Sequence, residues 1–348
     1  MLKRSKWFVV FMVVALLVSS IAGCSSSAGS TAPAGGEKLF YEGKTITLIV
    51  PNTAGKGMDT YARMIVPYIQ KYSGAKNIIV KNITGAGGVI GINDLWNAKP
   101  DGLTIAFTSI PTIILSQLSE GEGVKYDATQ FTYLGRASTE ARILTVGGNS
   151  SIKSIEDIAD LGRDFKFPTQ GTDEDFFTMA VIANSLGFGL KAITGYEGNA
   201  DTALAVVKGD GDGHITAAMD AVTMIKEGDK RPILIIAPER MPEYPEVPTA
   251  LEAVQDETGK ASLQAIVNML EMHRSFFGPP NMDQEATIAL REAIFQALND
   301  PELQAKAEQT GLPIVPLKGD EEQGKVEIIA EAGKNIVPIL KAAVEATK

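Results

Sequence analysis

The sequence contains very little of the chemistry that most enzymes and metalloproteins use. It has one cysteine, Cys24, so no internal disulfide can form. Its two histidines, His214 and His273, match no metal-ligand spacing such as H-x-x-x-H. A G-x-S-x-G nucleophile elbow is also missing from the chain. These absences argue against a catalytic or metal site.

Basic residues are scarce relative to acidic ones. The chain has 32 Lys and Arg residues against 42 Asp and Glu residues, a formal net charge of −10 at pH 7. A nucleic-acid partner needs a basic surface, so this balance argues against nucleic-acid binding. It also argues against electrostatic adhesion to anionic lipid.

Three glycine-bearing segments lack the full motif of a cofactor or metal site. In Gly85–Gly91 the sixth position of a dinucleotide fingerprint is Ile90 rather than glycine. The Gly55–Lys56 pair lacks the upstream glycine of a phosphate loop, because Val50 stands there. Asp210–Gly213 lacks the third oxygen ligand and the closing glutamate of a calcium loop. We therefore expect neither a cofactor nor a metal ion.

The first residues indicate an export signal. A basic start of Lys3, Arg4 and Lys6 precedes an apolar run at 7–18. A membrane span needs roughly 20 apolar residues, so this run is too short for one. The run leads to Ile21–Cys24, which resembles a bacterial lipoprotein signal with Cys24 as the lipidated residue. We expect a signal peptide at 1–23 and a flexible, Ser/Ala/Gly/Pro-rich tether at 24–37. The alternative is a simple secretory signal with an accidental cysteine.

The rest of the chain alternates between strand-like and helix-like segments. This alternation predicts an α/β architecture with helices covering the sheets. The predicted strands are 46–50, 78–80, 103–107, 142–146 and 233–237, and the predicted helices are 58–73, 176–186, 201–208 and 287–298. Pro67 lies inside the first of these helices, where we expect a bend or a break.

The connection after the first strand is a candidate anion site. The strand ends at Pro51, a glycine-bearing turn follows, and Asp59 and Thr60 suit the first turn of a helix that Gly74 would cap. Such a turn presents unpaired backbone N–H groups beside the positive end of the helix dipole. The alternative is an ordinary strand-to-helix connection without a ligand.

A series of motifs resembles one protein family over nearly the whole chain after the tether. The motifs are Ile46–Pro51 with Ala54–Arg63, Val80–Gly91, Lys99–Ile105, Gly195–Gly198, Tyr244–Thr249 and Phe277–Pro280. Their order and spacing are similar to those of the substrate-binding proteins of tripartite tricarboxylate transporters, the Bug-type receptors. Each motif is only moderately specific, so the resemblance depends on the set.

The resemblance implies a type II periplasmic-binding-protein fold, with two lobes, a central ligand cleft and a hinge. One lobe would comprise 38–138 plus 246–348 and the other 139–245, with crossings near 131–136 and 238–248. The implied function is a lipid-anchored extracytoplasmic solute receptor. It would capture a small organic carboxylate or an amino acid and deliver it to the transporter's membrane subunits. The alternative is a lipid-anchored enzyme acting on a small carboxylated substrate in the same cleft.

The resemblance also implies which residues bind the ligand. In the first lobe they are Thr53, Ala54, Gly55, Gly57, Thr108 and Ser109, and in the second Gly171, Thr172, Tyr196 and Asp220. Lys56, Asp173 and Glu174 are further candidates that the resemblance does not itself supply. Two features depart from the family pattern. Lys56 stands where a glycine is usual, and the second lobe's turn, usually small and hydroxyl-rich, continues as the acidic run Asp173–Asp175.

The acidic run Asp173–Asp175 allows two interpretations. Acidic residues favour a helix N-terminus, so the run could cap the helix predicted at 176–186. Alternatively, Asp173 or Glu174 faces the cleft and pairs with an ammonium, amide or hydroxyl group of the ligand. The ligand would then be an amino acid or another carboxylate with a donor group rather than citrate, and Lys56 could neutralise its carboxylate.

Overall fold

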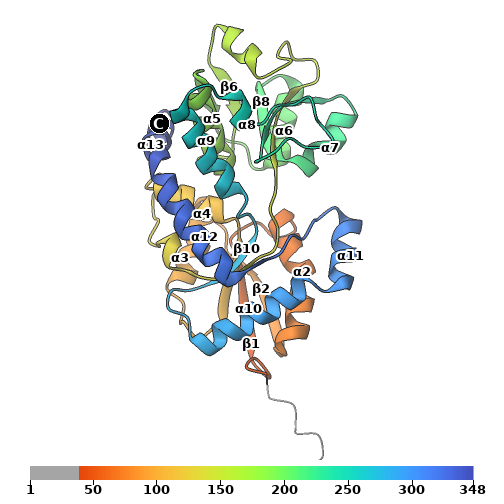
Figure 1. Cartoon of the computed structure of the whole chain (residues 1–348), viewed down its shortest axis with the longest axis vertical. Helices are drawn as coiled ribbons and strands as arrows, with labels where there is room; N and C mark the ends of the chain where they lie inside the picture. Colours follow the sequence, from red (N-terminus) through yellow and green to blue (C-terminus); the bar gives the residue numbers. More distant parts are fainter. Residues whose placement is uncertain (1–38, 348) are drawn as a thin grey trace, which may run out of the picture. The chain divides into compact units, whose positions relative to one another are not determined.

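The computed structural model describes residues 39–347, which form a two-lobed α/β structure (Figure 1). The predicted signal peptide, Cys24 and nearly all of the predicted tether lie outside the described residues. Within 39–347, no helix combines the length and apolarity needed to cross a membrane.

The first lobe is built on a six-stranded mixed sheet. Strand β1 lies between β2 and β3 and is parallel to both, whereas β10 runs antiparallel to β3 and β4. In spatial order the strands are β11 (Leu317–Lys318), β4 (Thr132–Arg136), β10 (Ser275–Gly278), β3 (Thr104–Thr108), β1 (Thr45–Val50) and β2 (Asn77–Asn82). Strand β1 is apolar because it is central, and Ile46, Leu48 and Val50 are fully buried.

Helices cover this sheet. They are α2 (Gly57–Ser73), α3 (Val89–Trp96), α4 (Ile110–Leu118), α10 (Gln284–Leu298), α11 (Pro301–Thr310) and α12 (Gly319–Ala332). Helix α2 packs against α10, and the two bury Ile65 and Leu290 in one apolar cluster (Figure 1). Helix α2 continues through Pro67 without a break, and the bend expected there stays a prediction. The helix ends as predicted at Gly74, whose φ of 69° is left-handed.

The second lobe is built on two small sheets. Strand β5 (Arg142–Gly147) runs antiparallel to β8 (Gly213–Ala217) on one side and to β9 (Lys230–Ile236) on the other. Strands β6 (Phe165–Pro168) and β7 (Leu190–Ile193) form a parallel pair. The helices of this part are α5 (Glu174–Leu186), α6 (Asn199–Lys208) and α7 (Ala218–Lys226).

The chain passes between the sheets at places other than those expected. Residues 132–136 form β4, so the first crossing is the segment 137–141 that joins β4 to β5. The loop 238–248 does not cross, because the Ile235 N–H donates to the Pro248 carbonyl at 2.9 Å. The return crossing is 271–274, between α9 (Glu257–Leu270) and β10. The predicted bounds of the lobes stay a prediction.

Four helices form a shared core beside these crossings. Helix α9 and the C-terminal helix α13 (Val337–Glu345) both pack against α5, and α4 contacts α5, α9 and α13 (Figure 1). One apolar cluster joins Ile113 of α4, Phe177 of α5, Leu263 of α9 and Leu340 of α13. The short helix α8 (Ala250–Ala253) contacts β9 and α9.

The predicted strands and helices are all present, and three helices begin two or three residues earlier than predicted. Helices α5, α6 and α10 begin at Glu174, Asn199 and Gln284. Asp173 caps α5 and Asp283 caps α10, each accepting a backbone N–H three residues later. The apolar spacing alone did not include these polar first turns. The 3₁₀ segments of the described residues are Ala86–Gly88, Ala128–Gln130, Glu156–Leu161 and Gly333–Ile336.

Candidate functional site

The turn Thr53–Gly57 between β1 and α2 is exposed, as an anion-binding turn requires. Gly55 has a φ of +76°, a conformation that favours glycine. Its N–H donates to Asp59 Oδ2 at 2.7 Å. This donor of the turn therefore already has an acceptor, in the first turn of α2. The side chain of Lys56 is exposed beside it.

Asp59 is fixed within the first lobe. Besides the Gly55 N–H, it accepts Arg63 Nε at 2.8 Å and Asn82 Nδ2 at 3.0 Å. Burial works to raise the pKa of Asp59, but the hydrogen bonds from Arg63, Gly55 and Asn82 and the Arg63 charge lower it overall. The sequence placed Asp59 in the first turn of the helix, but gave no sign that its carboxylate would occupy a donor of the preceding turn.

Thr108 and Ser109 are buried at the end of β3. The Thr108 hydroxyl donates to Asn52 Oδ1 at 3.3 Å, which ties this strand end to the one after β1. Ser109 is the N-cap residue of α4, yet its side chain makes no capping hydrogen bond. Instead its hydroxyl donates to Glu174 Oε2 at 2.5 Å. The structure therefore brings the predicted residues Ser109 and Glu174 together.

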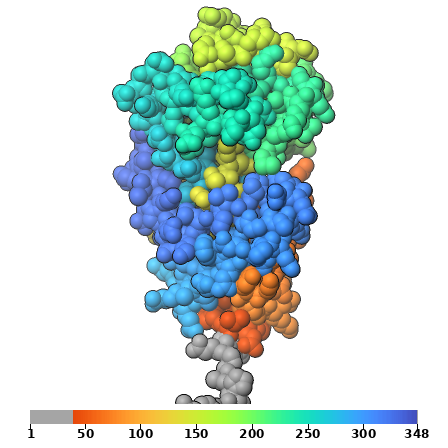
Figure 2. Space-filling view, turned by 45° about the vertical axis from the view of Figure 1, so that its right-hand side comes forward, coloured from red at the N-terminus to blue at the C-terminus, as the bar shows by residue number. Residues whose placement is uncertain are grey.

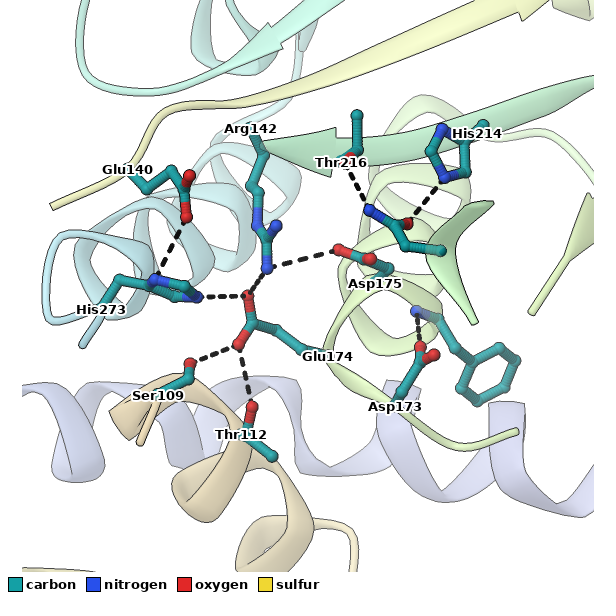
Figure 3. Close-up of polar contacts among 12 residues, drawn as sticks. Ser109, Thr112, Glu140, Arg142, Asp173, Glu174, Asp175, His214, Thr216 and His273 are labelled. Carbon is teal, nitrogen blue, oxygen red and sulfur yellow. Dashed lines mark hydrogen bonds and ion pairs between the residues drawn. The ribbon is translucent and has the colours of Figure 1, made fainter. Parts of the chain in front are cut away.

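The three residues of the acidic run Asp173–Asp175 make different contacts. Asp173 caps α5, since its Oδ1 accepts the Phe176 N–H at 2.8 Å (Figure 3). Burial and the Glu174 charge raise the pKa of Asp173 above its usual range. The helix-cap interpretation is confirmed for Asp173. Gly171 precedes it with a φ of +129°, and Thr172 is exposed.

Glu174 points out of α5 toward the first lobe (Figure 3). Its Oε2 accepts the Ser109 hydroxyl and the Thr112 hydroxyl, the latter at 3.0 Å, while its Oε1 pairs with Arg142 Nη2. The His273 Nε2 atom lies 3.7 Å from Oε1. Burial works to raise the pKa of Glu174, but Arg142, His273 and Ser109 lower it to about 2. Glu174 is therefore a fully ionised carboxylate with donors from both lobes.

Arg142 serves two carboxylates at once. Its Nη2 atom binds Glu174 and lies 3.6 Å from Asp175 Oδ1. Burial raises the pKa of Asp175 strongly, and the neighbouring charges of Asp173 and Glu174 raise it further, because the shared guanidinium compensates only in part. The cluster therefore holds more carboxyl groups than its cations can pair.

The two crossing segments complete the cluster. Glu140 of the first crossing lies 2.7 Å from Arg274 Nη1 and 3.3 Å from His273 Nδ1, both on the return crossing. Burial lowers the pKa of His273 to about 4, so the ring is neutral at pH 7. Arg274 adopts a left-handed φ of 54° and stacks over the Tyr61 ring at 4.0 Å. Ion pairs therefore join the two connections about which the lobes would move.

Sequence reasoning missed Glu140, Arg142 and Arg274, and assigned His273 no role. No spacing relates these residues, because the fold gathers them from β5 and from two crossings. The only available signal was charge at strand starts, as for Arg142, and that signal is weak.

Tyr196 and Asp220 belong to other parts of the second lobe than Glu174. Tyr196 is half-buried in the loop after β7, and Asp220 is exposed in the first turn of α7. Within residues 39–347, no hydrogen bond or ion pair joins either one to Glu174. Burial raises the pKa of Tyr61 to about 12, and the Asp220 charge contributes to that shift. The charge of Asp220 in the second lobe therefore contributes to the pKa of a side chain on α2 in the first lobe.

A second buried polar group lies inside the second lobe. His214 Nε2 lies 2.8 Å from Asn199 Oδ1, and Asn199 also binds Thr216 (Figure 3). The Nδ1 atom of His214 lies 2.7 Å from Lys230 Nζ. Burial and the Lys230 charge lower the pKa of His214 to about 3, and burial lowers that of Lys230 to about 8. This group pairs β8 with β9 across β5 and is distinct from the Glu174 cluster.

A small pocket lies beside the start of α4. Its lining includes Pro51, Gly87, Gly88, Thr108 and Thr112. Figure 2 shows yellow atoms of the crossing region in a recess between the teal and green surface and the blue surface. Among residues 39–347, no group of three or more His, Cys, Asp or Glu side chains is arranged to hold a metal ion.

Comparisons with known proteins agree with this architecture. A family profile described as "Tripartite tricarboxylate transporter family receptor" matches residues 62–344. A UPF0065 protein from the TAR-I ttuE-ttuC' intergenic region of Agrobacterium vitis is 24% identical over 313 residues, which cover 84% of this chain and 86% of that protein.

Solved structures show the same fold. The periplasmic binding protein BugD aligns with a TM-score of 0.65 at 20% identity, covering 87% of this chain and 98% of that one. MatC from Rhodopseudomonas palustris, solved with bound malate, aligns with a TM-score of 0.65 at 22% identity, covering 86% and 99%. The predicted periplasmic-binding-protein fold is therefore confirmed.

Proposed function

Because the chain belongs to the receptor family of tripartite tricarboxylate transporters, we propose that it captures a small organic carboxylate outside the cytoplasm and delivers it to a membrane transporter. One observation carries the proposal. The exposed turn Thr53–Gly57 presents its backbone at the N-terminus of α2, with the Lys56 side chain beside it. This donor set is suited to recognising an acid group. The relative MatC, which binds malate, supports the same ligand class.

The ligand lies between turns of the two lobes in this proposal. Thr53–Gly57 and Thr108 face it from the first lobe, and Gly171–Glu174, Tyr196 and Asp220 from the second. The exposed backbone of Thr53–Gly57 and its place at the start of α2 support the assignment of the ligand's carboxylate to this turn. Lys56 adds a cation beside it.

Anchoring is a separate part of the proposal. Cys24 follows an apolar run and small residues, so it carries a lipid that holds the receptor at the outer face of a membrane. Cys24→Ala should therefore abolish incorporation of labelled fatty acid and leave an unprocessed or released protein. Labelled fatty acid in the Cys24→Ala protein would contradict this assignment.

Binding is tested by two measurements on the purified protein. Mass spectrometry of small molecules released by denaturation should find an organic acid. Calorimetric titration with mono- and dicarboxylates, and with amino acids beside their deaminated analogues, should give saturable binding to at least one of them. The ligand should be recovered chemically unchanged after incubation, which separates a receptor from an enzyme. Failure of every acid to bind would contradict the proposal.

A further inference from the structure

The carboxylate of Glu174 is held as a bound ligand would be. Four groups from three parts of the fold surround it: Ser109 and Thr112 at the start of α4, Arg142 on β5, and His273 on the return crossing (Figure 3). Glu174 is only 6% exposed, so it is excluded from bulk water. Its position is therefore the centre of a built carboxylate site.

The surrounding donors are not needed for local structure. The Ser109 hydroxyl caps no helix N–H, although Ser109 is the N-cap residue of α4. The buried Nε of Arg142 has no hydrogen-bond partner among the described residues. Because α4 has nine residues, its N-terminus adds the favourable potential of a helix dipole. This arrangement offers donors to an acid group, and the chain itself supplies that group.

We propose that Glu174 fills a carboxylate-binding site at the start of α4 from within the chain, and thereby makes the receptor select ligands that carry no second carboxylate at that position. The selectivity part rests on the proposed receptor function. A ligand carboxylate then binds at the turn Thr53–Gly57, and the part of the ligand nearest α4 is uncharged or a hydrogen-bond donor.

Electrostatics supports this selectivity. Among residues 39–347, Glu174 pairs with the guanidinium group of Arg142 and Glu140 pairs with that of Arg274, so both cations already have a carboxylate partner. A second ligand carboxylate near α4 would meet an ionised carboxylate in a water-poor site, where like charges repel strongly. A neutral or donor group would instead find an acceptor in Glu174.

The first experiment empties the site with Glu174→Ala and offers formate or acetate in its place. Each acid should raise the thermal unfolding midpoint of Glu174→Ala saturably, while the wild type should respond no more than it does to sodium chloride at equal ionic strength. Adding Ser109→Ala and Thr112→Val to Glu174→Ala should weaken formate binding by about tenfold or more, because hydrogen bonds to a charged group are lost.

Glu252→Ala is the matched control. Glu252 is also a first-turn glutamate bonded to an arginine, Arg240, but its side chain is 47% exposed. Removing it opens no enclosed site, so formate should have no specific effect. Should Glu174→Ala not fold, Glu174→Ser gives the same test with a smaller loss of polarity. A folded Glu174 variant without a formate response, or an equal response in Glu252→Ala, overturns the proposal.

The second experiment measures selectivity by calorimetry with butyrate against succinate and with hexanoate against adipate. The wild type should prefer the monocarboxylate of each pair, and Glu174→Ala should gain about tenfold or more in dicarboxylate affinity. A wild-type preference for dicarboxylates overturns the selectivity.

The formate response does not depend on any ligand of the wild type. If formate stabilises Glu174→Ala but the wild type binds no acid, the receptor function is refuted and this inference stands. If the wild type binds an acid but formate does not stabilise Glu174→Ala, this inference is refuted and the receptor function stands.

Discussion

Two helices of this protein begin beside a buried acid, and the donors that stabilise the two acids come from different parts of the fold. Asp59 lies in the first turn of α2, and its hydrogen-bond partners Gly55, Arg63 and Asn82 belong to the first lobe. Glu174 begins α5 in the second lobe, but two of its partners, Ser109 and Thr112, belong to the other lobe. The first acid orders a turn, whereas the second joins the lobes.

This difference bears on how a ligand would be recognised. Asp59 accepts the Gly55 N–H, the Thr53 carbonyl accepts the Lys56 N–H at 3.3 Å, and the turn stays exposed. Glu174 instead occupies the donors at α4 with its own charge. An acid therefore leaves the candidate anion turn exposed in one lobe, whereas in our proposal an acid fills the site at the start of α4.

The largest expected loss of stability comes from removing the guanidinium group that pairs with Glu174. Arg142→Gln leaves Glu174 and Asp175 buried without their shared guanidinium, and breaking a buried pair in this way typically costs about 3–5 kcal/mol. Urea unfolding of the variant and the wild type measures the loss.

Arg63→Gln is the corresponding change at Asp59. Arg63 is 51% exposed, and Asp59 keeps the Gly55 and Asn82 donors, so we expect a loss under about 1 kcal/mol. Equal losses for the two variants would show that the two acids are not stabilised differently.

Acid titration sharpens the same comparison. The folded-state pKa of Glu174 is lowered to about 2, so its stabilisation is complete above the ordinary carboxyl range and is lost as pH falls toward about 2. A shift of this size corresponds to a loss on the order of 3 kcal/mol. Asp175 acts in the opposite direction, because its raised pKa makes stability fall as pH rises. Unfolding measured from pH 6 down to pH 2 should therefore show a smaller acid loss in Glu174→Gln, and an unchanged loss would contradict this account.

The exposed turn is tested by its two glycines, which differ in conformation. Gly55 needs its positive φ, so Gly55→Val strains the turn whether or not a ligand binds. A Cβ added at Gly57 meets nothing within 4 Å, so Gly57→Val should leave stability nearly unchanged. If the ligand's carboxylate approaches this turn, Gly57→Val should cost about 1.5–3 kcal/mol, roughly ten- to a hundredfold in affinity. Unchanged affinity by calorimetry would place the ligand elsewhere.

Much of the fold could be predicted from local patterns. The apolar strand 46–50 and the helical spacing after it correspond to β1 and α2, since burial sets both periodicities. Local chemistry also predicted the cap at Gly74 and offered a cap at Asp173 as one of two interpretations. Such features depend on neighbours within a few residues.

The Glu174 cluster could not be predicted in the same way. Arg142 precedes Glu174 by 32 residues in the sequence, and Ser109 precedes Glu174 by 65 residues. Only the packing of β5, α4 and α5 brings the three residues together. The crossings were misplaced for a related reason. Proline-rich composition at 238–248 signals a loop, but only the hydrogen bond from Ile235 to Pro248 shows on which lobe that loop stays.

The smallest expected effect separates Asp173 from its neighbour Glu174. Asp173 accepts the Phe176 N–H at 2.8 Å, so Asp173→Ala should lose a helix cap, about 1 kcal/mol in thermal or urea unfolding. Asp173→Asn should retain nearly all of that stability, because asparagine caps as well and carries no charge to bury. Asp283→Ala, which removes the equivalent cap of α10 in the first lobe, should cost a similar amount. Neither cap lies between the lobes in the way Glu174 does, so neither variant should create a formate response. If Asp173→Ala costs as much as Arg142→Gln, or if it binds formate, then the acidic run acts as one unit and the division between a capping acid and a bridging acid is wrong.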